Sequence, residues 1–307
     1  MELTVLTVPG CPTAQALRRR LEETLDAEDA RRVEWREVHD DAEAVRLGMH
    51  GSPTLLVNGA DPFVREGEPA SLSCRVRSGV PSVERLRAVL AEARTTEMAD
   101  RAGRGRLAPV EGGQRAVQQA VLRSFATHGR PPTTVELAAA AEPSGLPADR
   151  VLAELAAADY LSLDEAGAIR AAYPFSPVPT AHQVRIADGP RVWAMCAIDA
   201  LGIAPMLGRD ADIHSADPVT GQPVTVTFRG STATWDPASA VVLVSTGSCA
   251  GPAVDACCPD LNFFASPDTA RRWSDDHPEA RAGMVSRQRA EELGREIFGP
   301  LLAASAG

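Results

Sequence analysis

Residues 1–95 alternate between apolar strands and amphipathic helices. Apolar residues alternate with polar ones in ELTVLTV and RRVEWREV, which predicts two strands. In AQALRRRLEETL and SVERLRAVLAEAR the apolar positions recur three and four residues apart, which predicts helices, the second with a serine N-cap. Between these helices, AEAVRLGMHGSPTLLVNG combines a short helix, a Gly-Ser-Pro turn and a further apolar strand. Alternating strands and helices over this length predict one small α/β domain.

The pattern changes after residue 95. Residues 96–113 are polar, Gly-rich and aperiodic, which predicts a linker. Residues 114–180 then give three short helical patterns, and the last two, separated by a PSGL turn, have the outline of a winged helix-turn-helix. Between residues 112 and 182 there are five arginines against seven acidic residues. A helix that reads DNA should be basic, so we favour a helical packing module.

Residues 181–307 contain both the two-residue period of strands and the longer period of helices, which predicts an α+β domain. QVRIAD, PVTVTF and AVVLVS are predicted strands, whereas VWAMCAIDALGIAPML and SRQRAEELGREIFGPLL are predicted helices. This region holds four of the six cysteines of the chain.

Composition narrows the function classes. The chain has 307 residues, 44% of them hydrophobic, and a formal net charge of −10, which argues against nucleic acid or an anionic membrane as a partner. The first residues show no basic segment followed by a long apolar run, and no stretch of the chain approaches the length needed to cross a bilayer. We therefore expect no secretory signal, no membrane span and a cytoplasmic location. Thiols stay reduced there, so the cysteines are interpreted as reactive or metal-binding rather than cross-linked.

Two cysteine motifs stand out in the C-terminal region. Cys257 and Cys258 are adjacent, whereas a relaxed disulfide or a structural zinc site needs its cysteines further apart, so the pair requires a partner elsewhere. Cys196 and Asp199 lie three residues apart and share one face of the predicted helix. A carboxylate beside a thiol can take its proton and return it elsewhere. On spacing alone, a buried inert cysteine is the alternative.

These motifs resemble the organomercurial (alkylmercury) lyases. The resemblance rests on WAMCAIDALG, on TGQPVTV and on CCPDLNFFAS, in this order, and it covers roughly residues 114–300, with the helical module included. Several ordered motifs are stronger evidence than one short pattern.

The resemblance implies a reaction and assigns roles to residues. Cys196 and Cys257 would be the catalytic thiols that bind mercury as substrate and product, Asp199 the proton-transfer group, and Cys258 a dispensable auxiliary thiol. The reaction would be protonolysis of a carbon–mercury bond, giving a hydrocarbon and Hg(II), for organomercurial detoxification. No bound cofactor is expected, whereas external or tethered thiols would act as co-reactants, and a downstream acceptor such as mercuric reductase would take the product.

The sequence also departs from the pattern of the family. Its members often carry a further cysteine, which we take as structural, near the position of Asp217. PDLN follows the cysteine pair where histidines are expected, and Cys249 in a Gly/Ser-rich turn is expected to have no role.

The N-terminal domain contains a second thiol motif. In VPGCPTA, Cys11 precedes a predicted helix, where the helix dipole and free N–H groups lower a thiol pKa. GSPTLLVNG resembles the loop of thioredoxin-like domains whose proline, here Pro53, is cis and faces that thiol. Ala14 replaces the usual second cysteine, so an ordinary dithiol oxidoreductase is disfavoured. Cys74 could supply the missing sulfur, and the domain would then accept mercury or reduce the thiols of the lyase.

Two other functions remain open at this level. The first is a mercury or soft-metal binding or sensing protein that cleaves no carbon–mercury bond. The second is a thiol–disulfide redox protein in which both halves exchange disulfides.

Overall fold

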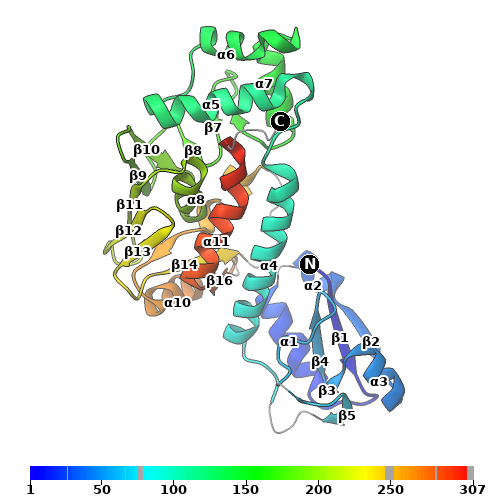
Figure 1. Cartoon of the computed structure of the whole chain (residues 1–307). Helices are drawn as coiled ribbons and strands as arrows, with labels where there is room; N and C mark the ends of the chain where they lie inside the picture. Colours follow the sequence, from blue (N-terminus) through cyan, green and yellow to red (C-terminus); the bar gives the residue numbers. More distant parts are fainter. Residues whose placement is uncertain are drawn as a thin grey trace. The chain divides into compact units, whose positions relative to one another are not determined.

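The computed structural model describes residues 1–25, 27–65, 67–74, 79–245, 252–256, 258–280 and 282–302. The chain divides into two compact units (Figure 1), the first built from Met1–Glu97 with two short segments of the C-terminal half, the second from most of the remainder. Among the described residues, no helix combines the length and apolar character needed to cross a bilayer.

The first unit is built on a three-stranded sheet in the order β2-β1-β4. Strand β1 (Leu3–Thr7) pairs in parallel with β2 (Glu34–Glu37) and antiparallel with β4 (Thr54–Val57). Two further short strands, β3 (His50–Ser52) and β5 (Ser71–Cys74), pair with each other in parallel. The α/β alternation predicted from the sequence is therefore present, while the thioredoxin-like assignment stays a prediction.

Alternate residues of the central strands face two different helical layers. Leu3 and Val5 pack with α1 (Ala14–Thr24) and α4 (Val83–Gly105), whereas Leu6 packs with residues around α3 (Asp41–Leu47). Figure 1 shows α1 and α3 on opposite sides of the strands. This arrangement follows from the two-residue period of a strand, which sends successive side chains to opposite faces. A short helix, α2 (Ala27–Arg32), precedes β2.

Helix α4 is longer than its sequence pattern predicted. Ser82 accepts a hydrogen bond from the backbone N–H of Arg85, which confirms the expected N-cap. The helix then continues to Gly105, through the first part of the segment expected to be an aperiodic linker. The residues after Arg94 include Glu, Met, Ala and Arg, which favour helix, and this preference outweighs the scattered glycines.

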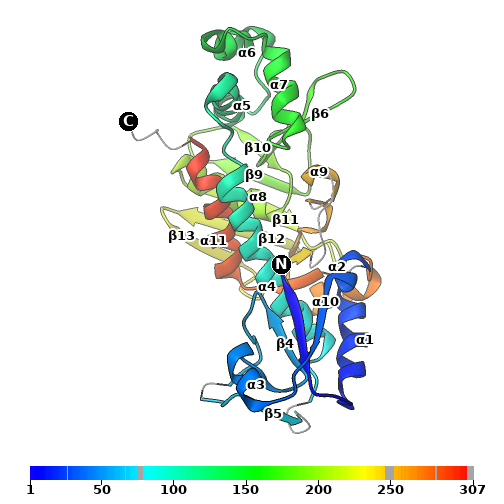
Figure 2. The same cartoon turned by 90° about the vertical axis from the view of Figure 1, so that its right-hand side faces the viewer.

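The second unit begins with three helices followed by a hairpin. Helices α5 (Gln114–His128), α6 (Thr134–Ala141) and α7 (Ala148–Ala157) lie together at one end of this unit (Figure 2). They are followed by the paired strands β6 (Ser162–Leu163) and β7 (Ile169–Ala171). This is the element order expected for residues 114–180, while the winged-helix assignment stays a prediction. Short 3₁₀ turns, η1 (Glu111–Gly113) and η2 (Glu142–Ser144), connect these helices.

A six-stranded antiparallel sheet forms the centre of the second unit, in the order β13-β12-β11-β9-β10-β8. Its strands are β8 (Phe175–Ser176), β9 (His182–Ile186), β10 (Arg191–Ala194), β11 (Ala211–Ala216), β12 (Pro223–Arg229) and β13 (Thr232–Asp236). The strands predicted at QVRIAD and PVTVTF are confirmed as β9 and β12.

One prediction in this region is wrong in its boundaries. The apolar run from Val192 to Leu207 was expected to be one helix, but its first residues form β10 and helix α8 (Ala197–Leu207) begins only after Cys196. Most side chains of the run are buried, so apolar residues continue across the junction and no period marks the point where strand gives way to helix.

Helix α8 packs closely against α11 (Arg287–Phe298). Gly202 of α8 faces the ring of Phe298, and Gly294 of α11 faces the backbone of α8. A second sheet, in the order β15-β14-β16, accompanies this pair. It is formed by β14 (Val241–Ser245), β15 (Phe263–Phe264) and β16 (Ala282–Val285). The remaining elements are α9 (Ala253–Ala256), η3 (Cys258–Asp260), α10 (Pro267–Asp276) and η4 (Gly299–Leu302).

Candidate active site

Cys196 is the N-cap residue of α8. Its backbone is extended, and its sulfur accepts a hydrogen bond from the backbone N–H of Asp199 at 3.4 Å. In return, the Cys196 thiol donates to Asp199 Oδ2 at 2.8 Å. The three-residue spacing therefore does bring thiol and carboxylate together, but through a helix cap and not through a shared helix face.

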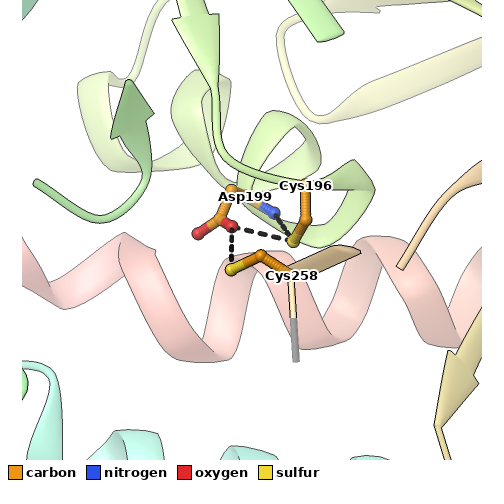
Figure 3. A group of neighbouring side chains, drawn as sticks. All are labelled: Cys196, Asp199 and Cys258. Carbon is orange, nitrogen blue, oxygen red and sulfur yellow. Dashed lines mark hydrogen bonds between the residues drawn. The ribbon is translucent and has the colours of Figure 1, made fainter. Parts of the chain in front are cut away.

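Cys258 reaches the same carboxylate from a distant part of the sequence. It lies at the start of η3, and its Sγ is 3.9 Å from Asp199 Oδ2. One ligand atom from each of Cys196, Asp199 and Cys258 lies within 4.8 Å of the other two (Figure 3). All three residues are buried, with at most 8% of their surface exposed. Cys257, expected to be the second catalytic thiol, and Cys249 lie outside the described residues.

Burial controls the protonation of this cluster. It raises the pKa of Asp199 to about 6, while the hydrogen bond from Cys196 and the positive charge of Arg106 act in the opposite direction. Burial also raises the pKa of the Cys196 thiol well above its ordinary value, and the nearby carboxylate and Cys258 raise it further. At neutral pH the shared proton therefore resides on sulfur and points at an ionised carboxylate.

Asp217 connects three segments of the second unit by hydrogen bonds. This buried carboxylate accepts hydrogen bonds from the N–H groups of Val219 and Thr220, at 2.8 and 3.1 Å, and from Ala265 N at 2.8 Å. The Thr269 hydroxyl also donates to it. At the position where a structural cysteine was expected, the chain thus has a hydrogen-bonded carboxylate that connects the Thr-Gly turn to β15 and α10.

The segment that follows Cys258 is also fixed to α8 itself. The backbone N–H of Ala197 donates to the carbonyl of Leu261 at 2.9 Å. The first turn of α8, which carries Asp199, is therefore joined by its backbone to the segment that carries the cysteine pair.

The thiols of the first unit lie around Ser52. Burial raises the pKa of Cys11, but hydrogen bonds from Ser52, Thr13 and Ala14 outweigh it and leave that pKa below its ordinary value. Cys74 is exposed on β5, in register with Ser52 of the neighbouring strand. The peptide bond between Ser52 and Pro53 is cis, as expected.

A group of residues beside the site was not predicted from the sequence. Arg106, Asp159 and Tyr173 contact one another, and Asp159 and Tyr173 also accept hydrogen bonds from the first residues of α9, the short helix that leads into the cysteine pair. They are far apart in the sequence and belong to none of the motifs, so no spacing pattern could have found them.

Comparisons with known proteins agree with the motifs. The family model for alkylmercury lyase matches residues 175–299. An alkylmercury lyase of Streptomyces lividans is 33% identical over 182 residues, which are 59% of this chain and 81% of that protein. An alkylmercury lyase of Staphylococcus epidermidis is 32% identical over 50% of this chain and 70% of that protein.

A solved structure shows the same fold. The crystal structure of the mercury-bound form of MerB2 superposes with a TM-score of 0.57 at 24% identity, over 68% of this chain and 100% of that one. Met1–Glu97, which forms most of the first unit, lies outside the residues matched by the family model. With relatives this similar over most of their own length, and with the cysteine and aspartate motifs gathered in one buried cluster, this chain belongs to the alkylmercury lyase family.

Proposed function

We propose that this chain cleaves the carbon–mercury bond of small organomercurials at the buried cluster around Asp199, as an organomercurial detoxification enzyme. The observation that carries the proposal is the hydrogen bond of 2.8 Å from the Cys196 thiol to Asp199 Oδ2, with a second thiol, Cys258, at the same oxygen. Thiolates are suitable ligands for a soft metal such as mercury. The burial of all three residues favours a small substrate over a macromolecule.

The first step is capture of the substrate by Cys196. The thiol transfers its proton to Asp199, and the resulting thiolate forms a sulfur–mercury bond with R–Hg⁺. The N-terminus of α8 assists this step, because its dipole and the N–H of Asp199 favour negative charge on the sulfur. A carboxyl with a pKa of about 6 is well matched to the task, since it can accept a proton at neutral pH and release it again.

Cleavage requires a second sulfur from the cysteine pair. Cys257, which the family resemblance assigns, adds to mercury as a thiolate, and its proton leaves the site. Electron density on the carbon then rises, and Asp199 delivers the proton that it took from Cys196. Overall, R–Hg⁺ and two thiols give R–H, mercury held by two thiolates, and one proton. Cys258 lies beside the carboxylate as an auxiliary thiol.

Product release needs further thiols. Mercury held by two thiolates leaves by exchange with two incoming thiols, which restores both cysteines. External thiols supply this exchange, and a mercury acceptor such as a mercuric reductase would take the product onward. A cytoplasmic location suits this chemistry because thiols stay reduced there. No cofactor is required in this scheme.

The first unit supplies a tethered thiol for this exchange. Cys11 is partly exposed and its pKa is lowered by hydrogen bonds, which increases the thiolate fraction, and Cys74 is a second thiol on the strand beside Ser52. We therefore infer that Cys11, with help from Cys74, accepts Hg(II) from the lyase site. The reduction of an oxidised catalytic pair would use the same residues.

The decisive experiment measures hydrocarbon release. The purified chain is incubated with phenylmercury or methylmercury and excess thiol, and benzene or methane is measured in the gas phase. Repeated turnover of at least one substrate is expected. Stoichiometric mercury binding without hydrocarbon would instead indicate a binding or sensing protein, and disulfide reductase activity without mercury binding would indicate a redox protein.

A further inference from the structure

Helix α9 directly precedes the cysteine pair, so its position determines where the pair lies. The helix has only four residues, Ala253–Ala256, and ends immediately before Cys257. So short a helix is not stable on its own, and its orientation must come from contacts with the rest of the unit.

A cluster of three side chains supplies such contacts. The carboxylate of Asp159 accepts a hydrogen bond from Ala253 N, at 3.3 Å to each oxygen, and the Tyr173 hydroxyl accepts one from Val254 N at 3.0 Å. These N–H groups belong to the first turn of the helix, where backbone N–H groups have no hydrogen-bond acceptor within the helix. We name Arg106, Asp159 and Tyr173 the α9 clamp.

The members of the α9 clamp hold one another in place. The Tyr173 hydroxyl donates to Asp159 Oδ1 at 3.1 Å, and the Arg106 guanidinium lies 3.5 Å from Asp159 Oδ2 and 4.1 Å from the centre of the Tyr173 ring. Gln118 of α5 fixes Arg106 in turn, by donating to its carbonyl. Asp159 has a φ of 57°, a left-handed conformation that Asp tolerates better than most residues.

The α9 clamp also borders the catalytic cluster. Tyr173 is buried, and its pKa is raised by burial and by the neighbouring Asp159, so its hydroxyl keeps its proton and remains a donor. The positive charge of Arg106 acts to lower the pKa of Asp199, and the proximity of Cys258 contributes to the raised pKa of Tyr173.

We propose that Arg106, Asp159 and Tyr173 are positioning residues that hold α9 and thereby the cysteine segment that follows it, in which Cys258 lies 3.9 Å from Asp199 Oδ2. This inference rests on the proposed function. The clamp is inferred to act through its hydrogen bonds to α9. It acts by reducing the freedom of the second thiol, and such positioning is required for the cleavage step but not for the initial capture by Cys196.

The first test is Tyr173→Phe, with Tyr160→Phe as the matched control. Phenylalanine keeps the buried ring and its contact with Arg106 but removes the hydroxyl that holds Val254 N. Single-turnover experiments with phenylmercury would follow capture, as loss of free Cys196 thiol, and benzene release separately. We expect benzene release to slow about tenfold, with capture unchanged, because the second thiol loses its fixed position. The control should match the wild type in both steps.

A second pair of variants separates positioning from folding. Asp159→Asn keeps an oxygen that can accept from Ala253 N, whereas Asp159→Ala removes it. We expect the asparagine variant to retain most of the cleavage rate and the alanine variant to lose about tenfold, at similar capture rates. Equal benzene release in Tyr173→Phe and wild type, or loss of capture and release in parallel, would overturn the inference. If the wild type itself released no hydrocarbon, the proposed function would fail, and this would be evident before any variant is made.

Discussion

Asp199 lies buried beside two sulfur atoms, and the chemistry depends on where its proton resides. In the resting site the proton is on Cys196 and points at Asp199 Oδ2. In the proposed mechanism, mercury then binds the sulfur of Cys196, and the carboxyl of Asp199 becomes the proton carrier. In the proposed mechanism one oxygen thus serves as the base in the first step and as the acid in the second.

Asp199→Asn tests this role directly. An amide cannot take the thiol proton or deliver it to carbon, so hydrocarbon release should fall by about 10² to 10⁴-fold. Binding of the organomercurial by the cysteines should persist and is measured as protein-bound mercury after gel filtration. Turnover near the wild-type rate would show that water or another group carries the proton.

Single serine variants distinguish the roles of Cys196, Cys257 and Cys258. Cys196→Ser and Cys257→Ser should each abolish cleavage, because mercury then lacks one of its two sulfur ligands. Cys258→Ser should retain most of the turnover. The opposite result for the adjacent pair would assign the second ligand to Cys258, the thiol that lies beside Asp199. Turnover in Cys196→Ser would exclude the mechanism.

His182 makes the stability of the protein depend on pH. Burial lowers the pKa of this histidine from 6.5 to about 4, and it lies beside the Ser215 hydroxyl and the Phe263 ring. Between pH 6.5 and pH 4, His182 is therefore protonated in the unfolded chain but not in the folded chain. The contribution of neutral His182 to the free energy of unfolding is fully present above pH 6.5. As the pH falls from 6.5 to 4, the free energy of unfolding decreases by about 3 kcal/mol.

His182→Gln should remove this part of the pH dependence. The free energy of unfolding, measured by urea denaturation between pH 4 and pH 7, should then change less steeply than in the wild type. His214→Gln, a change at an exposed histidine of β11, serves as the control. Identical slopes for wild type and His182→Gln would show that other groups cause the acid sensitivity.

At the scale of elements, α8 is held in place by close packing against α11. A Cβ atom at Gly202 would lie 2.2 Å from Phe298 Cδ2, so only glycine allows this approach. Gly202 is about one turn beyond Asp199, which means that the packing of the two helices also sets the position of the Asp199 carboxylate.

Gly202→Ala should therefore destabilise the fold by about 1 to 3 kcal/mol, because the added methyl forces the two helices apart. Chemical denaturation measures this loss. In Gly299→Ala, the control, the new Cβ would meet nothing closer than Arg295 Cγ at 3.8 Å. A Gly202 variant as stable as its control would show that Phe298 moves aside at little cost.

The sequence patterns predicted many of these elements and failed where burial removes periodicity. Strands β9 and β12 and helix α11 were recognisable from their periods, whereas the step from β10 to α8 was hidden in a continuous apolar run. In the site, the motifs identified Cys196 and Asp199 as partners. The contact of Cys258 with Asp199 and the α9 clamp depend on residues brought together only by the tertiary fold.

At the scale of the whole molecule, the lyase unit is attached to an N-terminal unit with thiols of its own. The two units are joined through α4, and the first contains Cys11, with its lowered pKa, and the exposed Cys74. Covalent attachment can give one thiol a high effective concentration at another, provided that the connection lets them meet. The benefit should be greatest when free thiol is scarce.

Cys11→Ser, or removal of residues 1–95, should therefore leave the first turnover intact and slow the later ones at low external thiol. The physical reason is that mercury held by two thiolates leaves only by exchange with an incoming thiol, and the tethered thiol is then missing. Benzene release from phenylmercury is followed over many turnovers at limiting and at saturating thiol, with Cys74→Ser measured beside Cys11→Ser to separate the two cysteines. Saturating thiol should restore the wild-type rate, because external exchange then replaces the tethered one. Multiple-turnover rates equal to those of the full chain at limiting thiol would show that the N-terminal unit takes no part in mercury release.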